Sequence, residues 1–401
     1  MTRLALLVLG GIIDCLEAPV PIPAPSAEAI RYYDSGNILW LVATLWGLLL
    51  PATVFFTGFS ACLRRWAGRL SRHWYPVLVI YVIALTVVLF AADLPLDYYA
   101  DFWRPHAYGL SSQHIGKWLH DEAVGLGLSC LAGALLLWIP FLLLKRSPER
   151  WLFYSWLVGV PILFTVAVIE PIWIEPLFND FGPMQDRALE AEVFTLAHRA
   201  GIDDASIFQV NKSVDTNELN AYVTGIGNTK RIVLWDTTIQ ATTPGELTAV
   251  VGHEMGHYVL GHVWQGLILG SVGLLAALWL AHRCARWTLR RFASRTGVGD
   301  ASDVASLPMF LVIFGIISLL FQPAALAFSR HMEHEADRFG LDLTHDNHDC
   351  AMVFAKFVRH DLAYPSPGPL YVLWRSSHPS LADRIEFCNH YHPWAEGETP
   401  R

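Results

Sequence analysis

Six long apolar runs constrain the fold of this chain more than any other feature of its sequence. A helix needs about 20 mostly apolar residues to cross the hydrocarbon core of a bilayer. Runs of this kind occupy residues 38–63, 75–94, 123–144, 151–174, 263–281 and 304–328. Because backbone groups in lipid must be satisfied within the spanning segment, each run is expected to be a helix. The pattern therefore predicts an α-helical multispanning membrane protein with six clear spans.

Composition supports a membrane location and excludes one class of partner. Charged residues make up 16% of the chain and hydrophobic residues 53%, whereas soluble domains usually contain about 25% charged residues. The net charge of −8 offers no basic surface to a phosphate backbone, and binding to nucleic acid depends on such a surface. The lipid bilayer is the expected environment, and nucleic acid is not expected as a partner.

The N-terminus leaves two interpretations open. An apolar run at residues 4–13 follows Arg3 and ends before Asp14, and its length fits the core of a cleaved signal peptide. An uncleaved, imperfect seventh span is the alternative.

Basic residues are distributed unequally among the loops, which predicts the topology. Twelve lysines and arginines lie between spans one and two, three and four, and five and six, whereas the loop 95–122 holds only Arg104 and Lys117. The basic side is expected in the cytoplasm. By the same count, residues 175–262 and 329–401 face the opposite side, which is the periplasm if the protein lies in a bacterial inner membrane.

The first of these polar stretches contains signals for both helix and strand. Residues 185–200 have the pattern of an amphipathic helix, and residues 206–210, 221–224 and 231–235 that of short strands. Thr243 is then followed by Pro244 at the first helical position and by Glu246 three residues after the cap. These residues predict a helix that begins at Thr243 and runs toward the fifth span.

This helix carries an H-E-x-x-H motif at residues 253–257. Residues four apart share a helical face, so His253 and His257 can bind one zinc ion while Glu254 takes a proton from a water molecule on it. Chance occurrence and a buried structural pair of histidines are the alternatives. The capped helix beside a span favours the catalytic interpretation.

A third ligand is expected from elsewhere, because a catalytic zinc usually has three protein ligands and a water. After the sixth span, Glu333 and Asp337 lie four residues apart in a polar stretch. We assign Glu333 to the metal and Asp337 to the second ring nitrogen of a ligand histidine. A solvated polar helix end is the alternative, and His331, His334 and Glu335 are not assigned to these positions.

A further histidine follows in Ser377-His378-Pro379, with Arg384 shortly after it. A histidine across the site from the metal can donate a hydrogen bond to the oxyanion of a tetrahedral intermediate, which would make His378 catalytic. Taken alone, such a residue is more often an ordinary surface histidine.

With these residues together, the chain resembles the type I CAAX prenyl endopeptidases, which are integral-membrane zinc proteases of the gluzincin class with HtpX-type relatives. The ordered set of motifs carries the resemblance, because H-E-x-x-H alone is a weak signal. The matching segments are residues 108–111 (YGLS), 175–179 (EPLFN), 220–222 (NAY), 229–236 (TKRIVLWD), 253–257 (HEMGH), 329–337 (SRHMEHEAD) and 377–384 (SHPSLADR).

The resemblance implies a cofactor and its ligands. One Zn²⁺ per chain is expected, held by His253, His257 and Glu333, with Glu254 as the general base. The family also surrounds a large chamber with seven helices, which favours the N-terminal run as a first span.

Four further site residues follow from the resemblance. His378 and Arg384 are expected to line the site. Asn220 and Ala221 are expected on an edge strand, which can bind an extended substrate by strand addition.

The implied activity is removal of the C-terminal tripeptide of prenylated CAAX proteins or peptides, so the expected partner is a peptide or protein substrate. Two alternatives stay open. One is membrane-protein quality control by an HtpX-type protease, because a periplasmic site makes prenylated proteins doubtful substrates. The other is a transporter or scaffold in which His331 or His334 closes a structural zinc site. An intramembrane protease of the site-two type is disfavoured, because the motif precedes its span.

These assignments divide the chain into five parts: a short hydrophobic segment and linker (1–36), transmembrane helices with loops (37–174), a protease segment with the edge strand and H-E-x-x-H helix (175–262), two transmembrane helices (263–328) and a protease segment with the third ligand (329–401). The expected fold is thus a multispanning helical protein with an α+β gluzincin domain formed from two polar segments. The oligomeric state stays open. So does the pairing of Cys350 with Cys388, since a disulfide requires a periplasmic or luminal site.

Overall fold

The computed structural model describes residues 18–203, 205–225 and 230–395, so the N-terminal run at residues 4–13 lies outside the described residues. Six helical segments are long and apolar enough to cross a membrane, at residues 27–56, 74–107, 115–146, 151–177, 262–296 and 304–344. Each overlaps one of the predicted runs. The expectation of six clear spans is therefore confirmed for the described part of the chain.

Several of these segments are composed of consecutive helices. Their elements are α2 (Ala27–Phe56); α4 (Trp74–Asp97), η1 (Tyr98–Trp103) and α5 (Arg104–Ala107); α6 (Ile115–Leu136) and α7 (Trp138–Arg146); α8 (Trp151–Ile169), η2 (Glu170–Ile174) and η3 (Glu175–Leu177); α12 (His262–Thr296); and η6 (Val304–Ser306) with α13 (Leu307–Thr344).

The first span begins and ends earlier than its apolar run. Ser26 caps α2 by accepting a hydrogen bond from the Ala29 N–H at 3.0 Å, which starts the helix within the preceding polar segment. Gly58, with φ of 75°, then separates α2 from α3 (Phe59–Leu70). This separate helix is amphipathic, and it carries most of the basic residues found between spans one and two.

The sixth span continues without interruption into the polar stretch that follows it. Helix α13 ends only at Thr344, where His345 takes a left-handed conformation with φ of 58°. No glycine or internal proline breaks the helix between the apolar run and Asp337. A membrane helix therefore positions Glu333 and Asp337.

The spanning helices pack around one apolar core and expose their remaining faces. Phe55, Tyr81 and Ala281 are fully buried in this core. Large apolar side chains such as Trp173 and Leu320 are exposed on the same helices. This distribution is expected where lipid, rather than water, surrounds the protein.

A four-stranded sheet forms the β part of the molecule, with strand order β1-β2-β4-β3. Its strands are β1 (Phe181–Pro183), β2 (Ser206–Val210), β3 (Ala221–Thr224) and β4 (Arg231–Trp235). Strands β2 and β4 are parallel, and the other two pairs are antiparallel. The three predicted strands have the predicted bounds, whereas β1 was not predicted. Strand β3 lies at the edge of the sheet, as the resemblance implied.

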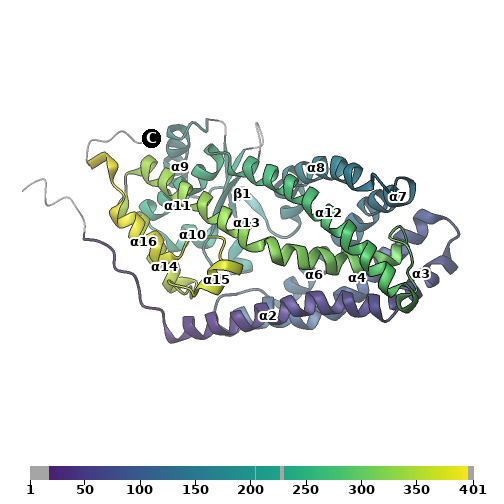
Figure 1. Ribbon diagram of the computed structural model, residues 1–401. Helices are drawn as coiled ribbons and strands as arrows, with labels where there is room; N and C mark the ends of the chain where they lie inside the picture. Colours follow the sequence, from purple (N-terminus) through teal and green to yellow (C-terminus); the bar gives the residue numbers. More distant parts are fainter. Residues whose placement is uncertain (1–17, 204, 226–229, 396–401) are drawn as a thin grey trace, which may run out of the picture.

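Helices from both polar segments complete this part. They are α9 (Arg187–Arg199), α10 (Asp236–Ala241), α11 (Pro244–Val259), α14 (Asn347–His360), α15 (Pro369–Trp374) and α16 (Leu381–His390), with the short η4 (Lys212–Val214) and η7 (Pro393–Ala395). Leu234 of the sheet and Val251 of α11 are buried in a shared core. Figure 1 shows these helices and the sheet gathered at one end of the molecule, with α3 and α7 at the other.

Three local features stabilise this unit. Thr243 and Glu246 form the predicted capping box at the start of α11. Gly261, with φ of 71°, turns the chain from α11 into α12. A disulfide between Cys350 and Cys388 joins α14 to α16.

Candidate metal centre

The site is built where α11 and α13 cross at close range. Neither helix has a side chain at the points of closest approach: a Cβ at Gly256 would lie 3.0 Å from the Ala336 Cα, and one at Gly340 would lie 2.9 Å from the His253 nitrogen. These glycines allow the two backbones to touch. The crossing brings Glu333 of α13 opposite the two motif histidines of α11.

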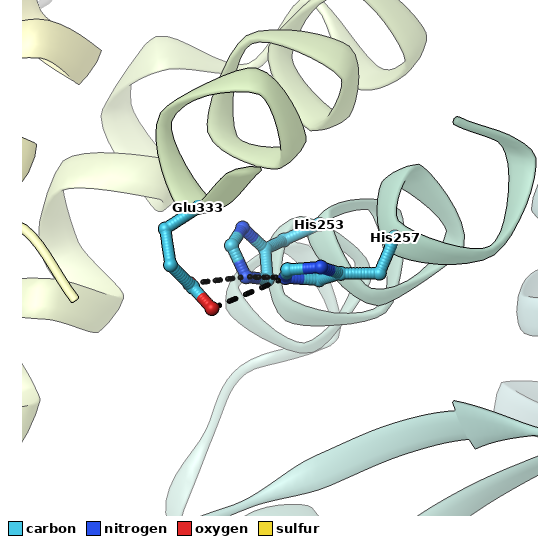
Figure 2. A group of neighbouring side chains, drawn as sticks. All are labelled: His253, His257 and Glu333. Atoms are coloured by element: carbon cyan, nitrogen blue, oxygen red, sulfur yellow. Dashed lines mark hydrogen bonds and ion pairs between the residues drawn. The ribbon is translucent and has the colours of Figure 1, made fainter. Parts of the chain in front are cut away.

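Three side chains converge at this crossing, as Figure 2 shows. The His253 Nε2 lies 3.2 Å from the His257 Nε2 and 3.2 Å from the Glu333 Oε2. The His257 Nε2 lies 3.4 Å from the Glu333 Oε1. These are the three residues that the sequence analysis assigned to the metal.

The arrangement fits a zinc ion. Ligand atoms about 2.0–2.1 Å from a tetrahedral zinc lie about 3.4 Å from one another, which is close to the three separations given above. The Glu333 Oε2 is also buried, and no neighbour meets it with hydrogen-bond geometry although the His253 Nε2 lies 3.2 Å away, whereas a buried carboxylate oxygen normally accepts a hydrogen bond. A cation between the three side chains would satisfy this oxygen.

The other ring nitrogen of His253 is held by a buried ion pair. Its Nδ1 lies 2.8 Å from the Asp337 Oδ1. Arg384 donates to both oxygens of that carboxylate, from Nη2 at 2.6 Å and from Nε at 2.9 Å. This contact points the Nε2 of His253 toward the centre. Arg384 acts here through Asp337.

The charge of Asp337 also changes the proton affinity of His253. Burial lowers the pKa of His253, but the charge and hydrogen bond of Asp337 outweigh burial and raise this pKa to about 9. In the absence of a metal, the imidazolium therefore supplies the positive charge that the two carboxylates require. Metal binding must displace that proton.

Glu254 lies beside the ligand group without belonging to it. Its Oε1 is 4.0 Å from the His253 Nε2. Burial raises the pKa of Glu254, and the nearby histidines oppose this effect. A carboxylate with a raised pKa is suited to accept a proton and to release it again.

His378 approaches the centre from the segment between α15 and α16. Its Nε2 lies 3.3 Å from the Glu333 Oε2, and its Nδ1 lies 2.8 Å from the Ser377 hydroxyl oxygen. The side chain is half exposed and lines the cavity opposite the motif helix. This position leaves the ring accessible to a bound substrate.

A cavity of about 550 Å³ opens onto the centre. It collects most of the residues that the sequence analysis selected: Asn220, His253, Glu254, Asp337, His378 and Arg384. His257, Glu333 and Ala221 are not among the lining residues. Ala221 is the first residue of β3, directly after Asn220.

The backbone pattern shows how the edge strand is oriented. The Trp235 N–H donates to the Asn220 carbonyl, and the Asn220 N–H donates to the Thr238 hydroxyl, so the main-chain groups of Asn220 face away from the open side of β3. The N–H of the next residue, Ala221, then points away from β4, where the Asn220 amide oxygen accepts it at 2.8 Å. At Ala221, the N–H on the open side of β3 is thus capped by the Asn220 side chain.

From the sequence His262 is expected to be a structural or interfacial histidine, and in the structure it contacts a motif histidine. The His262 Nδ1 lies 2.9 Å from the His257 Nδ1, and its Nε2 lies 3.5 Å from the Glu335 Oε2. His262 thus contacts the Nδ1 of His257, just as Asp337 contacts the Nδ1 of His253. The turn at Gly261, which brings His262 back over α11, was the available signal.

The fourth ligand of a structural zinc site is not found in the part of the chain that the structure describes. The ligand group contains three residues there. The ring of His334 stacks edge-on against Phe387 with centroids 4.6 Å apart, and His331 lies near Glu335. The alternative of a closed zinc site therefore gains no support from these two histidines.

Comparisons with known proteins place both halves of the chain. Residues 183–392 match the model of Peptidase family M48. Residues 28–180 match a second model, described as the CAAX prenyl protease N-terminal region with five membrane helices.

Whole-chain relatives agree with these matches. The uncharacterized metalloprotease YhfN of Bacillus subtilis is 32% identical over 364 residues, covering 91% of this chain and 85% of its own. The CAAX prenyl protease 1 homolog of Dictyostelium discoideum is 29% identical, covering 90% of this chain and 83% of its own. The crystal structure of S. mikatae Ste24p has the same fold, with a TM-score of 0.78 at 23% identity over 90% of this chain and 87% of its own.

Proposed function

Because this chain belongs to Peptidase family M48 and is a multi-pass membrane metalloprotease, we propose that it is a zinc-dependent endopeptidase that cleaves near the C-terminus of its substrate. The observation that carries the proposal is the group of His253, His257 and Glu333, with Glu254 beside it at the wall of one cavity. Relatives named CAAX prenyl protease 1 support a prenylated C-terminal segment as the first substrate class to test.

Each side chain of the site then has one task. A bound zinc supplies Lewis acidity, which polarises the scissile carbonyl and makes water easier to deprotonate. Glu254 takes the proton from that water and delivers it to the leaving amine. His378 donates a hydrogen bond to the developing oxyanion. Asp337 holds the His253 ring in the orientation that ligation requires.

The edge strand supplies the binding mode for the substrate backbone. An extended peptide on the open side of β3 would accept a hydrogen bond from the Ala221 N–H, after the Asn220 amide group has moved aside. Strand addition of this kind binds main chain, while pockets select side chains. The proposal thus gives Asn220 and Ala221 a role in binding.

Quality-control proteolysis is the second candidate, and one observation favours it. Cys350 and Cys388 form a disulfide in the protease unit, and disulfides persist in oxidising compartments such as the periplasm. The unequal distribution of basic residues supports the same side of a bacterial inner membrane. Misfolded membrane proteins would meet a periplasmic site more readily than cytosolic prenylated proteins would.

Mass spectrometry of two peptides separates these candidates. A farnesylated CAAX peptide and its unlipidated counterpart are incubated with detergent-purified, zinc-loaded protein, with Glu254→Gln as the control. Loss of the last three residues from the farnesylated peptide alone supports a prenyl endopeptidase. Cleavage of neither peptide, together with cleavage of a denatured membrane protein, supports quality control.

A fusion experiment tests the side of the membrane. Alkaline phosphatase joined to the C-terminus is expected to be active, because it folds only outside the cytoplasm. An inactive phosphatase fusion with a fluorescent green fluorescent protein fusion would place the site in the cytoplasm instead.

A further inference from the structure

Two arginines line the cavity without taking part in the metal centre. Arg104 lies on α5 and is only 7% exposed. Its Nη2 donates to the Tyr32 carbonyl at 2.6 Å, and its guanidinium lies 3.7 Å from the centre of the Tyr32 ring. Arg375 follows α15, and its Nη1 donates to the Asn37 amide oxygen. Both side chains are thus fixed against α2.

The two guanidinium groups converge on one point of the cavity wall. A Cβ at Gly36 would lie 3.0 Å from the Arg104 Nη2 and 3.8 Å from the Arg375 Nη2. Because Gly36 has no side chain, both guanidinium groups can lie against its backbone on the same part of the cavity wall. This arrangement resembles a fork of donors open toward the cavity that also contains Glu254 and His378.

Neither arginine has an anionic partner in the part of the chain that the structure describes. The acceptors of Arg104 are the Tyr32 carbonyl and the Ser35 hydroxyl, and that of Arg375 is an amide oxygen. The cavity also holds Asp337 and Asp361, but these carboxylates contact Arg384 and His360.

Arg104 is buried and Arg375 is half-buried, and holding two like charges together where water is partly excluded is unfavourable unless an anion joins them. Burial and the positive charge of Arg104 both lower the pKa of Arg375, against the opposing effect of nearby tyrosines. A bound anion would remove this repulsion. Guanidinium groups form their strongest contacts with carboxylates and phosphates, often through two parallel hydrogen bonds.

The position of the two arginines in the same cavity as Glu254 and His378 limits which anion they can bind. Arg375 lies three residues before His378 in the chain, so their Cα atoms are at most about 11 Å apart. Three residues of an extended peptide span about 10 Å. Both arginines line the same cavity as His378, so an extended peptide whose scissile bond lies next to His378 can place an anionic group at the arginines.

We propose that Arg104 and Arg375 bind the C-terminal carboxylate of the peptide substrate, so that the position of the cut is measured from the end of the chain. This inference rests on the proposed endopeptidase function and adds a requirement to it. The substrate class becomes peptides with a free C-terminal carboxylate that shares the cavity with the scissile bond, and the arginines determine specificity without touching the reacting atoms.

The test compares one peptide in two forms. A farnesylated CAAX octapeptide is made with a free carboxylate and with a C-terminal amide, and kcat/KM is measured for each with the zinc-loaded full chain. The wild-type protein is expected to prefer the free acid by about ten- to a hundredfold, the usual contribution of a hydrogen bond to a charged group. Equal rates for the two forms would overturn the proposal without any variant.

Variants then identify the residues. Arg375→Gln is expected to reduce the acid-to-amide preference at least tenfold, through KM rather than kcat, and Arg104→Gln to act in the same direction. Arg31→Gln, an exposed residue of α2, is the matched control and keeps the preference. A preference that persists in both cavity variants would place the carboxylate elsewhere and overturn the assignment.

Two further outcomes separate this inference from the proteolytic function and from lipid binding. If no peptide is cleaved, the two forms are compared for binding to Glu254→Gln. Acid-selective binding that is lost in Glu254→Gln/Arg375→Gln supports the carboxylate site even though the proposed function fails, and equal binding overturns both.

Loss of bound phosphatidylglycerol from Arg375→Gln in native mass spectrometry, with an unchanged acid-to-amide ratio, would assign the arginines to a lipid phosphate and overturn the proposal.

Discussion

Replacing Gly340 by alanine tests whether the close crossing of α11 and α13 assembles the metal centre. The added Cβ would lie 2.9 Å from the His253 nitrogen, 3.2 Å from the Gly252 carbonyl carbon and 3.3 Å from the His253 Cα. Unstrained contacts between such atoms lie at about 3.5–4.0 Å. All three atoms belong to backbone and cannot rotate away, so α13 must move back by about 0.5–1 Å.

This movement is large compared with the tolerance of a zinc site. Ligand distances in a functional site vary by about 0.2 Å, and Glu333 is attached to the helix that moves. We expect Gly340→Ala to weaken zinc binding about ten- to a hundredfold, similar to the effect of changing a residue that orients a ligand. Overpacking also costs about 1–3 kcal/mol of stability.

The assay is a competitive chelator titration of the detergent-purified protein, with proteolysis and thermal unfolding measured in parallel. Gly270→Ala in α12 is the matched control, because a Cβ there meets nothing within 4 Å. It should leave zinc affinity unchanged. Wild-type zinc affinity in Gly340→Ala would refute the reasoning that the crossing sets the ligand geometry.

Four other perturbations have expected outcomes. Glu254→Gln should lower kcat by about 10²–10⁴-fold while inductively coupled plasma mass spectrometry finds the same zinc content; loss of zinc would contradict its role as the base. Because His253 has a pKa of about 9 without metal and must be neutral to bind it, apparent zinc affinity should fall about tenfold for each unit that pH drops below 9. Asp337→Asn should flatten this dependence, and a slope that is unchanged would exclude Asp337 as its cause. Cys388→Ser removes a disulfide that spans 38 residues and should lower the free energy of unfolding by about 4 kcal/mol. Thermal unfolding of the variant and of the wild type, each under oxidising and reducing conditions, measures this loss. Equal stability of the oxidised and reduced wild-type protein would count against the disulfide.

The spans and the strands could be predicted from sequence because each depends on a local pattern. Apolar runs of about 20 residues indicated all six spans, and alternating short segments gave β2, β3 and β4 at their observed bounds. The start of α2 could not be found in this way, since Ser26 caps it within a polar segment. Strand β1 has three residues and includes a glycine and a proline, so it carries no periodic signal.

The candidate site divides along similar lines. The spacing of His253 and His257 predicts their common face, and Glu333 was selected by the four-residue interval to Asp337. The contact of His262 with His257 depends on how the turn at Gly261 directs the chain. Arg104 was noted only as an exception to the charge distribution, because its proximity to Arg375 arises from tertiary packing of α5, α2 and α15 that no local pattern encodes.

The division of the ligands between α11 and α13 has a consequence for biosynthesis. During synthesis both histidines emerge first, and Glu333 follows only after α12 and most of α13 have been made. The nascent chain therefore lacks one ligand until the last helical hairpin has inserted into the bilayer. The ligand group can therefore be complete only in a chain that has been synthesised through α13, so its assembly and that of the last two membrane helices are one event.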